Sequence, residues 1–87
     1  MIKVFIPPLL RPATNGLDQI EVEAATVRQV VAALEKRHPG IRERLCADDS
    51  LRPGLAVAVN GAVSSLGLLQ KVPDGSEVHF LPAIGGG

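Results

Sequence analysis

The chain has 87 residues, nine Lys and Arg that balance nine Asp and Glu, and two aromatic residues, Phe5 and Phe80. This length predicts one domain with one core, and the neutral charge with so few stacking rings argues against a nucleic-acid partner. Cys46 is the single cysteine, so no intrachain disulfide can form, and no stretch approaches the roughly 20 apolar residues of a membrane span. We therefore expect a cytoplasmic protein without a membrane partner.

Two strands are predicted at the start of the chain. Residues 2–6 alternate between apolar and other positions, and the pattern ends at Pro7-Pro8, since proline cannot donate to a strand ladder. Residues 9–15 are rich in turn formers and are expected to form a loop. Alternation returns over residues 19–24 with one polar face. Because the connection is about ten residues long without helical periodicity, the two strands are expected to pair as an antiparallel hairpin.

One amphipathic helix is predicted over about residues 27–37. Thr26 and Gln29 have the spacing of a capping box, in which the Thr hydroxyl accepts an N–H bond and the Gln side chain reaches back. Apolar residues follow at i, i+3, i+4 and i+7 on one face: Val27, Val30, Val31 and Leu34. Pro39-Gly40 ends the helix, because the residue before a proline is pushed out of the α region and glycine suits a helix terminus.

The second half of the chain is predicted to contain mainly strands. Residues 41–54 are a polar connection with room for one helical turn at 41–45. The continuous apolar run 55–59 is expected to lie centrally in the sheet. It is followed by Asn60-Gly61, the strongest short hairpin signal.

The last strand is predicted over residues 77–81, after a turn at 73–75. The resulting order is strand, strand, helix, strand, short strand, strand, which is the order of the β-grasp. We therefore predict an α+β, ubiquitin-like β-grasp fold with a mixed sheet covered by one main helix. Residues 1–87 are expected to form a single domain, with a flexible tail over residues 83–87.

The chain ends in three consecutive glycines, Gly85, Gly86 and Gly87. Glycine has no Cβ, so such a tail can thread a channel that is too narrow for any side chain. From Pro82 to Gly87 it can extend by about 20 Å, at ~3.3 Å per residue. The alternative is a frayed terminus without function, and the tail alone does not decide between the two interpretations.

Strand order, length and ending resemble the ubiquitin-like sulfur carriers, which include the thiazole sulfur carrier and the small subunit of molybdopterin synthase. The marks of the resemblance are the terminal Gly-Gly and the two turns Asn60-Gly61 and Asp74-Gly75. Within the family, residues 6–12 and 40–45 look most similar to the sulfur carrier of actinobacterial cysteine biosynthesis. Gly85 departs from the family pattern, which has a small or β-branched residue there. The extra glycine should loosen the tail by roughly 0.5–1 kcal/mol of backbone entropy.

The resemblance implies that Gly87 is the reactive residue and that Gly85 and Gly86 thread it into partner enzymes. A ubiquitin-activating-type partner would use ATP to adenylate the Gly87 carboxylate, and a persulfide sulfur donor would then turn it into a thiocarboxylate. A sulfur-accepting biosynthetic enzyme, for example one that uses pyridoxal phosphate, would take the sulfur. In this interpretation the chain binds no cofactor and is a protein sulfur donor, not an enzyme.

Three functions share this chemistry at the free Gly87 carboxylate. The first is a carrier for the biosynthesis of cysteine or a related sulfur metabolite. The second is the small subunit of molybdopterin synthase, which stays docked to a catalytic subunit, and the third is a lysine-conjugating modifier. Because all three need the same terminus, the tail does not separate them.

A docking surface is expected where the last strand ends. The outer surface near Phe80, Leu81 and Pro82 should form part of an apolar patch for the activating enzyme, because an isolated tail has too little area for recognition. Strand alternation leaves open whether Phe80 belongs to the core instead.

The remaining chemistry-bearing residues favour structural roles. Cys46 has no CxxC partner and is interpreted as an incidental thiol. His38 is expected at the helix end and His79 at an outward position of the last strand, and neither has the spacing of a metal ligand. Residues 48–50 lack the glycine and the distant Glu of a calcium loop and are expected to form a solvated turn. No metal site is predicted.

Overall fold

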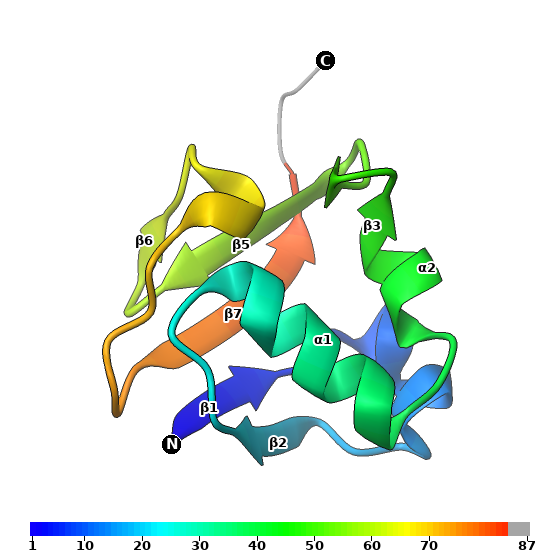
Figure 1. The fold of residues 1–87 in the computed structure, drawn as a ribbon. Coiled ribbons are helices and arrows are strands. Elements are labelled where there is room, and N and C mark those ends of the chain that lie inside the picture. Colours follow the sequence, from blue (N-terminus) through cyan, green and yellow to red (C-terminus); the bar gives the residue numbers. More distant parts are fainter. Residues whose placement is uncertain (84–87) are drawn as a thin grey trace.

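The last strand of the chain lies in the middle of a five-stranded mixed sheet with the order β2-β1-β7-β5-β6 (Figure 1). The structure is a computed structural model that describes residues 1–83. Its strands and helices are β1 (Ile2–Phe5), η1 (Pro8–Thr14), β2 (Gln19–Val22), α1 (Val27–Arg37), α2 (Ile41–Leu45), β3 (Cys46–Ala47), β4 (Ser50–Leu51), β5 (Leu55–Val59), β6 (Ala62–Val63), η2 (Gly67–Leu69) and β7 (Glu77–Pro82).

The pairing of the sheet confirms the predicted hairpins. β1 and β2 are antiparallel, with Ile2 opposite Val22 and Phe5 opposite Gln19. β7 runs parallel to β1 and antiparallel to β5. The expectation that β5 is central needs a correction, because β5 lies between β7 and the two-residue β6, and β7 takes the centre.

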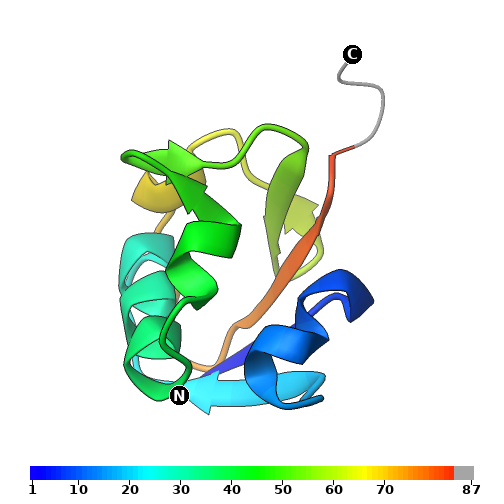
Figure 2. The same cartoon turned by 90° about the vertical axis from the view of Figure 1, so that its right-hand side faces the viewer.

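Helix α1 covers one face of the sheet and has the predicted bounds (Figure 2). The Thr26 hydroxyl accepts the N–H of Gln29 at 3.2 Å. The Gln29 side chain also reaches back, but it accepts the N–H of Ala25 at 2.7 Å, one residue before the partner of a standard capping box. Gly40 has φ +102°, a conformation that glycine adopts without strain, and it separates α1 from α2. Within residues 1–83 no helix is long and apolar enough to cross a membrane.

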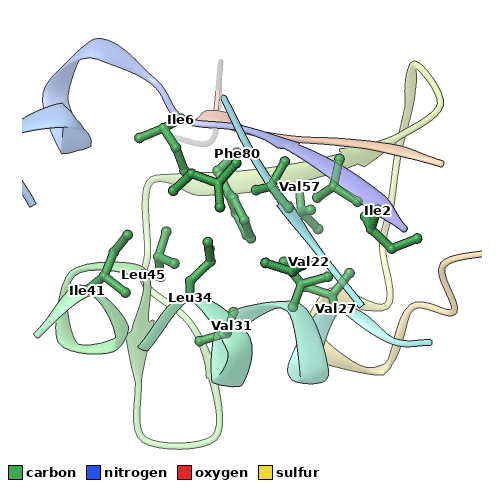
Figure 3. Close-up of a cluster of buried hydrophobic side chains, with 14 of the residues drawn as sticks. Ile2, Ile6, Val22, Val27, Val31, Leu34, Ile41, Leu45, Val57 and Phe80 are labelled. Carbon is green, nitrogen blue, oxygen red and sulfur yellow. The ribbon is translucent and has the colours of Figure 1, made fainter. Parts of the chain in front are cut away.

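The core lies between the sheet and the helices (Figure 3). Side chains from β1, β5 and β7 meet those of α1 and α2, and they include Ile2, Val4, Leu34, Leu45, Val57, Val78 and Phe80. All four apolar positions predicted for the helix face are buried. The alternation of β1 and β7 therefore divides the sheet into a packed inner face and an outer face away from α1.

Two segments differ from the predictions. The expected loop over residues 9–15 is largely the 3₁₀ helix η1, which buries Leu10 and Thr14. The expected polar connection 41–54 contains the predicted helical turn as α2, but also the small β3–β4 hairpin, where Cys46 is buried. Both elements, η1 and the hairpin, are too short to show a repeating pattern of apolar residues in the sequence. Short 3₁₀ helices and two-residue strands are stabilised mainly by tertiary packing, so the sequence pattern did not predict them.

Asn60 ties the β5–β6 turn to the start of β7. Its φ of 51° and that of Gly61, 85°, confirm the predicted tight hairpin turn. The Asn60 side chain donates to the Ser76 hydroxyl at 3.2 Å and accepts the N–H of Glu77 at 2.9 Å. Ser76 is buried, and its bond with Asn60 is partly shielded from water, whereas the bond with Glu77 is exposed. Asn60 therefore helps to position the strand that leads to the C-terminal glycines.

Replacing Asn60 by glycine should lower the free energy of unfolding by about 1–2 kcal/mol, because the turn keeps its positive φ while two side-chain hydrogen bonds are lost. Asn15→Gly is the matched control: Asn15 has a φ of 55°, and its side chain makes no hydrogen bond within residues 1–83. The control should change stability by less than about 0.5 kcal/mol. Urea unfolding measures both. Equal losses would show that the Asn60 side chain does not fasten β7.

Candidate functional site

The candidate site is the end of β7, which is followed in the sequence by the C-terminal glycines. Gly85, Gly86 and Gly87, the predicted threading and reactive residues, lie outside the described residues. The described part of the site consists of Phe80, Leu81 and Pro82 at the end of β7.

The backbone at this end is held mainly by β5. Pairing with β1 ends where His79 lies opposite Phe5, but pairing with β5 continues until Pro82 lies opposite Leu55. One residue further, the N–H of Ala83 donates to the carbonyl of Gly54 at 2.9 Å. The chain is therefore hydrogen-bonded to the sheet as far as Ala83. The distance that the last four residues of the sequence can span starts from this residue.

Phe80 is not at the surface, which corrects the predicted docking surface. Its side chain is 2% exposed and belongs to the core, so it is not available to a partner. Leu81 points to the outer face of the sheet, where it lies opposite Ala56 and is half-buried, and Pro82 is exposed. A docking role for Leu81 and Pro82 stays a prediction.

The outer face carries an aromatic pair that sequence reasoning missed. The rings of Phe5 and His79 stack with centroids 4.2 Å apart and an angle of 3° between their planes. His79 is on the outer face, as predicted. Together with Leu81, Ala56 and Ala58, which pair on the same face, they form what we call the outer patch. Only the parallel register of β1 and β7 brings Phe5 beside His79, and a single sequence does not give that register.

Cys46 has the features of a structural thiol. It is 6% exposed, and burial raises its pKa against the opposing effect of the nearby Arg42, Arg28 and Arg52. A raised pKa keeps the sulfur as a thiol at neutral pH and lowers its reactivity. Within residues 1–83 no three side chains of the metal-ligating types His, Cys, Asp and Glu gather into a cluster.

The other predicted structural positions are as expected. His38 caps the C-terminal end of α1. Asp48 and Asp49 form the turn between β3 and β4, in which Asp48 has a φ of 57°, whereas Ser50, predicted to lie in the same turn, is the first residue of β4 and pairs with Ala47.

Glu35 fixes the start of α2, the helix that carries Arg44. Its carboxylate accepts the N–H groups of Gly40, at 3.0 Å, and Arg42, at 2.9 Å. These two bonds lower the pKa of Glu35, since they favour its charged form. Helix α2 then carries Arg44 to the side of the β7 end, where it lines a small cavity with Pro82.

A mixed sheet with a central last strand and one main covering helix, in a sequence that ends in glycines shortly after that strand, defines a ubiquitin-like β-grasp protein. Comparison with known proteins then gives the family. The family model of the "ThiS family" matches residues 5–87. The chain belongs to the ThiS family.

Individual relatives agree with this assignment. The sulfur carrier protein CysO of Mycobacterium tuberculosis is 38% identical over 93 aligned positions, which cover 99% of this chain and 98% of the relative. Its crystal structure covers 97% of this chain and 100% of its own at 34% identity, with a TM-score of 0.87. A chain of the BexX/CysO complex of Amycolatopsis orientalis reaches a TM-score of 0.91 at 36% identity, with 100% of both chains covered.

A more distant neighbour shares the fold alone. A putative subunit 1 of the molybdopterin converting factor from Pyrococcus furiosus is 24% identical, with a TM-score of 0.72, and the match covers 95% of this chain and 97% of that chain.

Truncating the two neighbouring residues of β7 should separate core from surface. Phe80→Ala should cost about 3–5 kcal/mol of unfolding free energy, because it empties a buried aromatic position. Leu81→Ala should cost about 1 kcal/mol, because its side chain is half-buried on the outer face. Urea or thermal unfolding measures both. Comparable losses would contradict the placement of these side chains on opposite faces.

Proposed function

We propose that this chain is a sulfur carrier whose C-terminal Gly87 is adenylated and converted into a thiocarboxylate, which donates sulfide in the biosynthesis of cysteine or a related metabolite. The chain supplies the carrier, and its partners supply the catalytic groups, so it is a cosubstrate and not an enzyme. We place it in the cytoplasm, where a buried single thiol such as Cys46 stays reduced.

The observation that supports this proposal is the similarity to CysO over the whole length of both chains. It extends over the segment that leads to the glycine tail, and the family match includes Gly87 itself. The geometry is compatible, because β7 is central in the sheet and its end is held by β5 as far as Pro82, directly before the C-terminal segment in the sequence.

The chemistry begins with a poor electrophile, the Gly87 carboxylate. An adenylating partner joins it to AMP from ATP and releases pyrophosphate. The outer sulfur of a persulfide on a donor protein attacks the acyl carbon and AMP leaves, which links tail and donor through an S–S bond. A thiol then attacks the donor's sulfur, so the donor leaves as a disulfide and –COSH remains on Gly87. Transfer to the acceptor, for which a pyridoxal-phosphate enzyme is one candidate, needs the sulfur within ~3–3.5 Å of the reacting carbon.

The adenylating partner is proposed to dock on the outer patch, which includes Leu81. This face lies away from α1 and combines the Phe5–His79 stack with half-buried apolar side chains. It adjoins the tail, so docking there would orient the carboxylate before it enters the partner's active site.

The two alternatives have less support. The molybdopterin-type neighbour is 24% identical, and similarity at that level shows the common fold, whereas CysO is 34–38% identical. For a lysine-conjugating role, no feature of residues 1–83 distinguishes a modifier from a carrier. Sulfur delivery for the biosynthesis of cysteine or a related metabolite is therefore the preferred function.

Incubation with the cognate adenylating enzyme, ATP and a persulfide donor should replace one oxygen of Gly87 by sulfur. Intact-mass analysis followed by fragmentation of the C-terminal peptide locates the change. The expected product requires ATP, because the carboxylate is unreactive without activation.

Cys46→Ala provides the control for sulfur held on the thiol. It should form the thiocarboxylate as the wild type does, since Cys46 is buried away from the surface. Sulfur found on Cys46, or an unmodified Gly87 with an adenylating enzyme that is active on its own carrier, would overturn the proposed function.

A further inference from the structure

A small apolar cavity with two arginines adjoins the end of β7. Its volume is about 220 Å³. Its walls come from η1, α2, the loop before β5, β5 and β7, and they include Leu9, Arg44, Arg52, Leu55 and Pro82. We call these five residues the tail collar. Three stretches of the sequence, residues 7–10, 44–55 and Pro82, thus meet at the end of β7.

The tail collar lies on the opposite side of β7 from the outer patch. Pro82 pairs with Leu55, and both belong to the face that carries Phe80 and Val57. Leu81, one residue earlier, faces outward. The two surfaces therefore flank the same point of the chain from different sides, and Ala83 leaves between them, held by Gly54.

The collar has an apolar projection that the fold does not use. Leu9 is 84% exposed, the largest exposed fraction among the large apolar side chains of residues 1–83. Its neighbour Leu10 is 6% exposed and packs in the core, so η1 is anchored by one leucine and presents the other. An isolated exposed leucine needs no explanation, but this one lines a cavity at the tail.

The two arginines of the collar keep unneutralised charge. The ion pairs within residues 1–83 are those of the Met1 amino group with Asp74 and of Arg28 with Asp49. Arg44 and Arg52 take part in neither. Arg52 donates through Nε to the carbonyl of Glu43, which orients the guanidinium without cancelling its charge. Both side chains are exposed, so they present positive charge around an apolar centre.

We propose that the tail collar is the docking surface for the sulfur-accepting enzyme, whose channel mouth presents an apolar side chain flanked by carboxylates. The inference rests on the proposed function, because it assigns the second partner of the same tail. Apolar burial in the cavity provides affinity, and carboxylates opposite Arg44 and Arg52 provide orientation and a faster encounter.

Assignment to the acceptor follows from the two-sided geometry of β7. The adenylating enzyme is proposed for the outer patch, and the same tail must afterwards enter a different enzyme. Separate surfaces on the two sides of β7 let each enzyme recognise the carrier by its own contacts. With separate surfaces, a substitution in the tail collar should slow sulfur delivery alone, and a substitution in the outer patch should slow thiocarboxylate formation alone.

The test uses charge reversal with a charge-matched control. Arg44→Glu/Arg52→Glu and Lys36→Glu/Lys71→Glu change the net charge equally, but the two lysines are exposed residues outside the collar. Each protein is converted into its thiocarboxylate with the adenylating enzyme. It is then mixed with the acceptor that consumes the wild-type thiocarboxylate in single turnover.

The collar variant should associate with the acceptor about tenfold more slowly than the control at low ionic strength, and the difference should shrink at high salt. Its rate of thiocarboxylate formation should stay within about twofold of the control, because the outer patch is intact. Leu9→Ala should weaken acceptor binding about fivefold, while Leu69→Ala, which is 71% exposed outside the collar, should not.

Each remaining outcome is decisive. If the collar variant delivers sulfur as the control does, the collar is not a docking surface. If thiocarboxylate formation slows, alone or together with delivery, the collar also serves the adenylating enzyme and the assignment to the acceptor is wrong. If the wild type forms no thiocarboxylate at all, the proposed function fails first, and the variants are not needed to show it. Thermal unfolding of each variant confirms that these exposed substitutions leave the fold intact.

Discussion

The ladder between β5 and β7 is the interaction on which the rest of the site depends. It extends from Val59 opposite Val78 to Leu55 opposite Pro82, and the bond from Ala83 to Gly54 continues it by one step. β1 stops supporting β7 at His79, so the last residues of β7 are held by β5 alone among the strands. This pairing fixes the backbone as far as Ala83, four residues before Gly87 in the sequence.

The same ladder sets which surfaces the tail offers. Because side chains alternate along a strand, Phe80 closes the core while Leu81 faces outward and Pro82 forms part of the tail collar. Burial of Phe80 stabilises β7. The next two residues, Leu81 and Pro82, are half-buried and exposed, so they remain available for recognition. Stability and recognition thus use consecutive residues of β7 without competing for the same side chain.

The sequence predicted the parts of this arrangement that have local signals. Helix α1 has an apolar stripe and a cap, and the Asn60-Gly61 turn is strong enough to read directly. The position of Phe80 was open because Phe80 and Leu81 are both apolar, so alternation identifies two faces without saying which one the helix covers. The Phe5–His79 stack and the collar require the register of strands and the packing of η1, which depend on contacts distant in sequence.

Removing Gly87 tests most directly whether the ladder delivers the terminus to a defined position. The deletion leaves a glycine carboxylate on Gly86 but shortens the reach by about 3.3 Å. Since a misplacement of ~1 Å can cost about 10²-fold in a positioned reaction, the rate of adenylation should fall by about 10²-fold or more while thermal stability is unchanged. Adenylation of the shortened chain at the full-length rate would contradict a terminus whose reach is set from Ala83.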